Sequence, residues 1–240
     1  RSSRRIVARG PEWVTIDRKG AYANETALRS VAIRSAPDVT FRRARASLPE
    51  TLTSEENDVL NTLIKAQIRR FGDRYDYDTG YLEAVADVAP GAVLRLVLTK
   101  GLSKRPASFP ASPYYAAMLR AAAWEDCGPC TQLVAAFALE DGVPAPTIRT
   151  VLARDYTTLP DQAAVAARFA DAALARDPEA VELRDTVRAI WGEAGVVTLS
   201  LALCGARIFP AFESALGKGE ACRTVVIGAL PPVAVQGHGR

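Results

Sequence analysis

Two cysteines separated by two residues lie between two stretches of helical character, and this arrangement constrains the fold more than any other feature. Residues 113–123 before the pair are rich in alanine and contain no β-branched residue, which favours a helix. After the pair, four apolar residues recur on one helical face: Leu133, Val134, Phe137 and Ala138. The sequence therefore predicts a helix, a short turn that holds Cys127 and Cys130, and a second helix.

The spacing of the two cysteines lets their sulfurs form a short disulfide ring or bind a soft metal ion together. Pro129 suits a first helical turn, so we expect the pair at a helix N-terminus. Free N–H groups and the helix dipole favour a thiolate there, whereas the carboxylates of Glu125 and Asp126 oppose it. Glu125 is the carboxylate close enough in sequence to serve the cysteines; otherwise it is a solvated charge at a helix end.

Cys-Gly-Pro-Cys is also the thioredoxin tetrapeptide, but that motif follows a β-strand, and here a helical pattern precedes it. The run 126–144, DCGPCTQLVAAFALEDGVP, instead resembles the alkylhydroperoxidase D / carboxymuconolactone decarboxylase-like family of all-α proteins. The resemblance covers roughly residues 53–226. It implies that Cys130 attacks a peroxide, that Cys127 resolves the product as a disulfide, and that a dithiol reductant restores the pair.

The resembled family also carries a glutamate upstream of the pair and a histidine four residues after the second cysteine. Tyr115 and Val134 stand at those positions here, so proton removal would fall to Glu125, to a tyrosine such as Tyr115, or to water. General base catalysis contributes about 10²–10⁴-fold, and we expect turnover to be lower than in histidine-bearing relatives by that factor. The alternative is a non-catalytic oligomeric module whose cysteines are structural, small apolar fillers or redox-sensing. Lactone decarboxylation is a further family-level option that does not need the pair.

Metal and cofactor sites are not predicted. Zinc would need two more ligands, and Cys204, Cys222 and His238 lack the spacing of a zinc knuckle. No glycine-rich phosphate-binding motif is present in the sequence. Cys204 lies in the most apolar run, 196–206, which is too short for the about 20 residues of a membrane span and is expected to form a buried core helix.

The charge distribution separates the first 50 residues from the rest. Residues 1–50 carry eleven Lys or Arg and five Asp or Glu, a balance of +6, which leaves −3 for the remaining 190 residues. We predict a flexible basic leader, or sequence upstream of the natural start, of which residues 1 to about 45 are dispensable for folding. The mildly acidic remainder gives no indication of nucleic-acid binding, and sparse cysteines without a signal-peptide pattern favour a cytoplasmic protein with no membrane association.

Residues 51–230 are expected to form a single all-α domain, a helical bundle of the alkylhydroperoxidase D-like type, followed by a tail over 231–240. Thr53 and Glu56 form a capping-box pattern, and the helix that follows is expected to end at Gly72. Further helices are predicted to begin at a set of prolines: Pro90, Pro113, Pro146, Pro160 and Pro178.

The C-terminal helical pattern should break at Gly192 and continue from residue 193 to about 216, with a kink or split at Pro210. We therefore expect at least six helices and no sheet of three or more strands. Thr224–Ile227 is the one segment with strand character. Members of the resembled family self-associate through helices with unburied apolar faces, which implies a homo-oligomer.

Overall fold

The computed structural model describes residues 5–9, 12–16, 54–218, 224–228 and 230–235. The chain divides into two compact units, Arg1–Thr51 and Leu52–Arg240. The described part of the first unit is an antiparallel hairpin of β1 (Arg5–Arg9) and β2 (Glu12–Ile16). This hairpin lies within the segment that the sequence predicted as a basic leader, and no sequence pattern indicated it.

The second unit is almost entirely helical, which confirms the all-α prediction for the described residues. The described residues of this unit form eight helices: α1 (Ser54–Tyr75), α2 (Gly80–Val88), α3 (Pro90–Leu102), α4 (Ala111–Trp124), α5 (Gly128–Glu140), α6 (Ala145–Leu152), α7 (Asp161–Ala175) and α8 (Glu179–Ala215). Among the described residues of this unit, the strands are limited to the two-residue pair β3 (Thr224–Val225) and β4 (Val233–Ala234). The finer prediction, a bundle of the alkylhydroperoxidase D-like type, remains a prediction.

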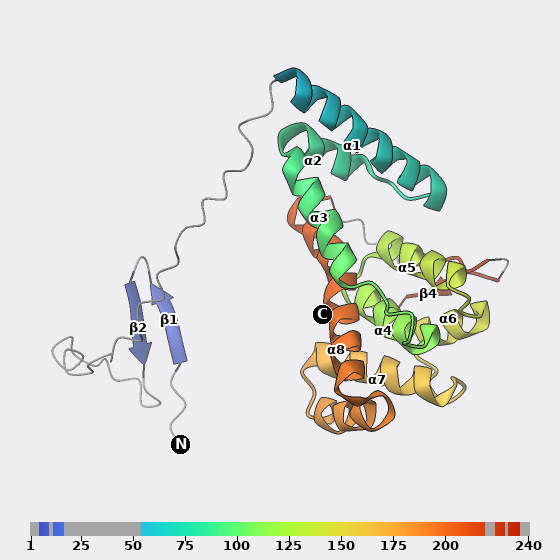
Figure 1. Cartoon of the computed structure of the whole chain (residues 1–240). Helices are drawn as coiled ribbons and strands as arrows, with labels where there is room; N and C mark the ends of the chain where they lie inside the picture. The colour runs from blue at the N-terminus through green and yellow to red at the C-terminus, as the bar shows by residue number, and fades with distance from the viewer. Residues whose placement is uncertain (1–4, 10–11, 17–53, 219–223, 229, 236–240) are drawn as a thin grey trace. The chain divides into compact units, whose positions relative to one another are not determined.

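Helices α4, α7 and α8 pack against one another and form the centre of this unit (Figure 1). Alanines fill the contact between α4 and α7, and their small side chains let the two helix axes approach closely: Ala117, Ala121, Ala163, Ala166 and Ala170 are all buried. A buried ion pair crosses the same contact, because Arg120 Nε donates to Asp171 Oδ1 at 2.8 Å. Helices α5 and α6 also contact α4.

Helix α8 is two helices joined at Gly192, whose φ of 69° is non-helical. This confirms the predicted break at that glycine, which adopts a positive φ without a Cβ clash. Length and composition alone would allow α8 to cross a membrane, but Leu199 and Leu203 on its inner face pack in the core with α4 and α7. The prediction of a buried Cys204 is wrong, because this cysteine lies on the exposed face of the helix.

The first helix extends past Gly72, where the sequence predicted its end, and stops at Tyr75. Gly72 serves close packing instead: a Cβ there would lie 2.9 Å from the backbone oxygen of Tyr77. The Tyr77 N–H donates to the Gly72 carbonyl at 3.0 Å, so the chain turns back tightly on the helix end. This turn fixes the position of Tyr77 ahead of α2.

The C-terminal segment packs on the helices rather than forming a loose tail throughout. Val233 and Val235, which lie in the predicted tail, are buried in the same cluster as Val225. The Gln132 amide on α5 holds β3 in place, since it both donates to and accepts from the Val226 backbone at 2.7 Å.

Candidate redox site

The turn between α4 and α5 places the two cysteines at a helix N-terminus, as the sequence predicted. Asp126 has a φ of 55° and turns the chain in the left-handed region, which aspartate tolerates better than most residues. Cys127 is then extended and forms the N-cap of α5, with its Sγ accepting the Cys130 N–H at 3.2 Å. The Thr131 hydroxyl donates to the Cys127 carbonyl at 2.8 Å and secures this first turn. The backbone N–H at Sγ stabilises a thiolate on Cys127 after reduction.

Cys127 and Cys130 are joined by a disulfide, with their Cα atoms 5.3 Å apart. Both residues are buried, yet they differ in surroundings. Cys130 forms part of a cavity wall, whereas Cys127 does not line that cavity. A small molecule that enters the cavity therefore meets Cys130 first.

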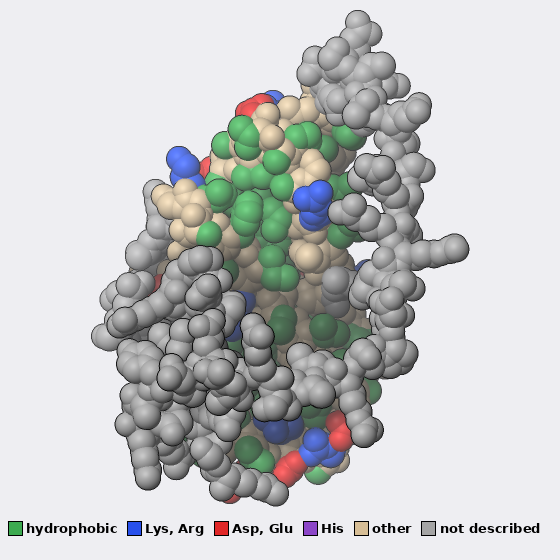
Figure 2. Space-filling view, turned by 90° about the vertical axis from the view of Figure 1, so that its left-hand side faces the viewer, with side chains coloured by type: hydrophobic (Ala, Val, Ile, Leu, Met, Phe, Trp, Pro, Cys, Tyr) green, Lys and Arg blue, Asp and Glu red, His purple; other side chains and the backbone are tan. Residues whose placement is uncertain are grey.

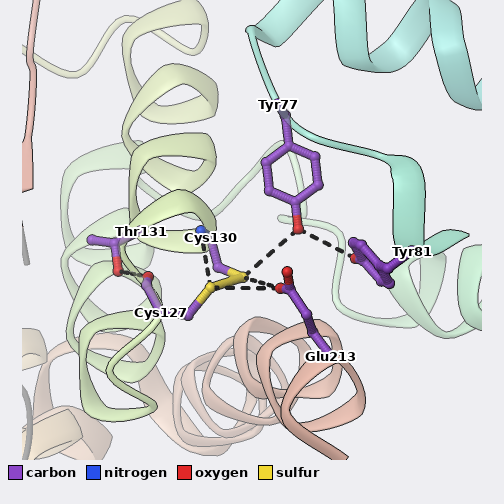
Figure 3. Close-up of a disulfide and its surroundings, with 6 residues drawn as sticks. All are labelled: Tyr77, Tyr81, Cys127, Cys130, Thr131 and Glu213. Carbon is purple, nitrogen blue, oxygen red and sulfur yellow. Dashed lines mark hydrogen bonds between the residues drawn. A yellow bond between two sulfur atoms is a disulfide. The ribbon is translucent and has the colours of Figure 1, made fainter. Parts of the chain in front are cut away.

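The carboxylate that contacts the sulfurs is Glu213 of α8. Its Oε2 atom lies 3.6 Å from Cys130 Sγ and 3.8 Å from Cys127 Sγ (Figure 3). Local sequence spacing does not indicate this contact, because more than 80 residues separate Glu213 from the pair. The local sequence signal that Glu213 faces inward is its position beside the partly buried Phe212 and one turn after the buried Pro210.

The two groups that the sequence proposed as bases make other contacts. Glu125 accepts a hydrogen bond from Arg207 Nε in an ion pair between the α4–α5 turn and α8. Tyr115 packs edge-on against Tyr114, with ring centroids 5.3 Å apart. Val134, at the family histidine position, is buried and lines the same cavity as Cys130. Of the zinc candidates, Cys204 is exposed on α8, and Cys222 and His238 lie outside the described residues.

Two buried tyrosines extend the site on the side opposite α5 (Figure 3). The Tyr77 hydroxyl lies 3.8 Å from Cys130 Sγ and 3.2 Å from the Tyr81 hydroxyl. Burial raises the pKa of Tyr77 to about 12 and also raises the pKa of Tyr81. Both hydroxyls therefore keep their protons at neutral pH, and the Tyr77 hydroxyl is the one that lies beside a sulfur.

The cavity next to Cys130 has a volume of about 540 Å³ and lies among α1, α2, α3, α5 and α8. Its wall is mostly aliphatic and aromatic, with Ile68, Phe71 and Phe209 among the lining residues. Lys100 is the one charged side chain among the described residues that line it, and its Nζ lies 4.2 Å from the centroid of the Phe137 ring. An apolar chamber with a reactive sulfur and a few polar groups is typical of a small-molecule site.

Comparisons of the chain with protein-family models, with curated proteins and with solved structures found no match. The family resemblance drawn from residues 126–144 therefore stays a prediction.

Proposed function

We propose that the protein is a thiol–disulfide redox enzyme that reduces peroxides through Cys130, with Cys127 as the resolving residue. One observation carries this proposal: Cys130 Sγ lines an apolar cavity and has a carboxylate oxygen 3.6 Å away. A reactive sulfur, a proton acceptor and a chamber for the substrate are the three parts that such chemistry needs.

In the first step the Cys130 thiol passes its proton to Glu213, and the thiolate attacks the terminal oxygen of the peroxide. The O–O bond breaks, a sulfenic acid forms on Cys130, and the leaving alkoxide takes the proton back from Glu213 as an alcohol. The Tyr77 hydroxyl, 3.8 Å from the sulfur, is a donor for the leaving oxygen. The carboxylate thus replaces the proton relay that the resembled family builds from glutamate and histidine.

In the second step the Cys127 thiol loses its proton, and the thiolate attacks the sulfenic sulfur and closes the disulfide. The departing hydroxide takes up that proton and leaves as water. The Cys130 N–H bonded to Cys127 Sγ stabilises this thiolate and holds it within bonding range. A dithiol reductant then supplies two electrons and two protons and returns both cysteines to thiols. Each cycle consumes one peroxide and one dithiol and yields one alcohol, one water and one disulfide.

The cavity favours a peroxide with an apolar substituent over hydrogen peroxide. Its lining buries hydrocarbon, and apolar burial contributes about 25 cal/mol per Å². An aromatic or alkyl hydroperoxide can therefore gain binding energy from the wall that hydrogen peroxide cannot.

The proposal is tested by peroxide-dependent oxidation of a dithiol, with mass spectrometry of the protein after each turnover. We expect the full chain to cycle between two thiols and the Cys127–Cys130 disulfide, and Cys130→Ser to abolish peroxide consumption. Cys204→Ser, at the exposed cysteine, is the matched control. If neither site cysteine affects peroxide consumption and no reversible disulfide forms, the enzyme proposal fails and a non-catalytic oligomeric module takes its place.

The oligomeric part of the prediction is supported by exposed apolar side chains on α1 and α3. Val59, Leu60, Leu94, Val97 and Leu98 are 41–62% exposed. Figure 2 shows hydrophobic side chains gathered in the upper part of the surface that the described residues form. Exposed apolar side chains that gather on a surface are typical of an interaction site, and we propose that a second copy of the chain covers these residues.

A further inference from the structure

We infer that the reduced cysteine pair, together with Glu213, binds one Zn²⁺ ion, and that oxidation to the disulfide releases it. The two Sγ atoms and a carboxylate oxygen of Glu213 lie within 4.8 Å of one another. Two thiolates and one carboxylate are ligands that zinc accepts, and three protein ligands with an open fourth position are typical of catalytic zinc sites. The third ligand, which the sequence did not supply, comes from α8.

The distances agree with a tetrahedral site. With Zn–S of about 2.3 Å and Zn–O of about 2.1 Å, a tetrahedron has S···O edges of about 3.6 Å and an S···S edge of about 3.8 Å. The observed S···O distances are 3.6 Å for Cys130 and 3.8 Å for Cys127. The S···S distance is the one edge that the disulfide makes too short for such a tetrahedron. Reduction breaks the S–S bond and lets the two sulfurs separate.

The charges favour a cation in the reduced state only. Two thiolates beside the partly buried Glu213 carboxylate would bring like charges close together, which is unfavourable. A divalent metal removes this repulsion and deprotonates the coordinating thiols. In the oxidised state the sulfurs have no charge to offer, and the carboxylate alone is a weak ligand.

The surroundings of the ligands support the same assignment. The Cys130 N–H donates to Cys127 Sγ at 3.2 Å, which orients this sulfur as outer-shell partners do in metal sites. The Tyr77 hydroxyl, 3.8 Å from Cys130 Sγ, can bond to a water in the fourth position.

Zinc coordination should slow the reaction of the pair with peroxide without preventing it. Oxidation by a peroxide takes two electrons from the two zinc-bound thiolates and forms the S–S bond. The peroxide takes up these electrons and two protons to leave as an alcohol and water, and Zn²⁺ is freed. This inference uses the site of the proposed redox function but does not require turnover.

The experiment measures Zn²⁺ binding to the full chain carrying Cys204→Ser and Cys222→Ser, which removes the other thiols. The protein is reduced with a phosphine, freed of reductant without oxygen, and titrated with Zn²⁺ against a chromophoric chelator. We expect one Zn²⁺ per reduced chain, none per oxidised chain, and release of the ion on adding hydrogen peroxide. Co²⁺ should give a thiolate charge-transfer band in the reduced protein.

Glu213→Gln tests the third ligand and should weaken Zn²⁺ binding at least about tenfold. Glu125→Gln is the matched control, because its carboxylate pairs with Arg207, and it should leave the affinity unchanged. Circular dichroism checks that each variant is folded. Equal affinity in Glu213→Gln and the parent chain, or no binding by the reduced parent, overturns the inference. The proposed redox function fails separately, when thiol titration finds no reversible disulfide in metal-free protein.

Discussion

Glu213 Oε2 lies 3.6 Å from Cys130 Sγ, although 83 residues separate these two residues in the chain. The contact brings a carboxylate from α8 to the N-terminus of α5, where a thiolate is already favoured by the helix (Figure 3). In the proposed mechanism this carboxylate is the proton acceptor, a role that the resembled family gives to a glutamate and a histidine.

Removing the Glu213 carboxylate should slow the reaction of reduced protein with a hydroperoxide. Glu213→Gln keeps the shape but removes the proton acceptor, so the rate of Cys130 oxidation should fall by about 10²-fold or more. Stopped-flow measurement of sulfenic acid or disulfide formation gives this rate. Glu140→Gln is the control: Glu140 lies at the C-terminus of α5 and forms an exposed ion pair with Arg74 of α1. This variant should react with the hydroperoxide at the rate of the parent chain. An unchanged rate in Glu213→Gln would assign the removal of the thiol proton to water.

The two cysteines should differ in the product that each single variant accumulates. Cys127→Ser leaves the attacking sulfur without its partner, so a sulfenic acid on Cys130 should be trapped by a dimedone-type reagent. Cys130→Ser should not form a sulfenic acid at the cavity wall. If the label appeared instead on Cys127 in the Cys130→Ser variant, Cys127 would be the attacking residue. Cys127 is the N-cap residue whose Sγ accepts the Cys130 N–H.

Restoring the family histidine should raise the rate. Val134 is buried and lines the cavity with Cys130, so Val134→His places an imidazole beside the reacting sulfur. We expect a gain of at least about tenfold in peroxide turnover near pH 7, from an added general base. Val134→Gln, of comparable polarity but without a base, is the control. A loss of activity in a folded Val134→His protein would mean that this position does not face the reaction.

Alkaline pH should destabilise the fold. Burial raises the pKa of Tyr77 to about 12 and of Tyr114 to about 12, above the ordinary value of 10.0. The unfolded chain therefore loses these protons from about pH 10, whereas the folded chain keeps them. The stability that the raised pKa values contribute is complete below pH 10 and is lost as the pH rises through 12. Urea unfolding at pH 8 and at pH 11 should show a lower free energy of unfolding at pH 11, and equal values would contradict this account.

The ion pair between Arg120 and Asp171 should be essential for stability. Arg120 is buried, and Asp171 also accepts from Tyr156, so Asp171→Ala leaves a buried guanidinium without its carboxylate. We expect a loss of about 3–5 kcal/mol in the free energy of urea unfolding. Glu193→Gln removes an exposed carboxylate from the ion pair with Arg188 and should change the free energy of unfolding far less, because solvent screens this pair. Similar losses of stability in both variants would contradict the expectation that the buried ion pair contributes more than the exposed one.

Charges on the exposed face of α1 and α3 should disrupt self-association. The double variant Val59→Glu, Leu98→Glu places two carboxylates at positions whose side chains are 61% and 62% exposed. The fold of the monomer should therefore persist. Light scattering coupled to size-exclusion chromatography should show a multimer for the parent chain and a monomer for the variant. Val181→Glu, on a side chain that is 54% exposed on α8, is the control and should stay multimeric. A monomeric parent chain would remove the homo-oligomer proposal.

The sequence predicted the helices because helix formation depends on local patterns. Proline starts and apolar spacing located most of the helices, and the break at Gly192 was placed correctly. The end of the first helix was wrong, because Gly72 is required by the close approach of the Tyr77 backbone rather than by a cap. Cys204 was wrongly placed in the core, because an apolar helix can bury one face and expose the other.

The sequence by itself determined that Cys127 and Cys130 stand at the start of a helix, since the turn, Pro129 and the helical pattern are all within a few residues of the pair. Only the tertiary structure decided which groups surround the sulfurs. Glu213 reaches Cys130 from α8, and Tyr77 reaches it from the turn between α1 and α2, both far from the pair in the sequence. Glu125, which lies close to the pair in sequence, pairs with Arg207. The physical reason is that local spacing fixes backbone conformation. Contacts between distant helices instead depend on how their faces pack and where breaks such as Gly192 redirect them.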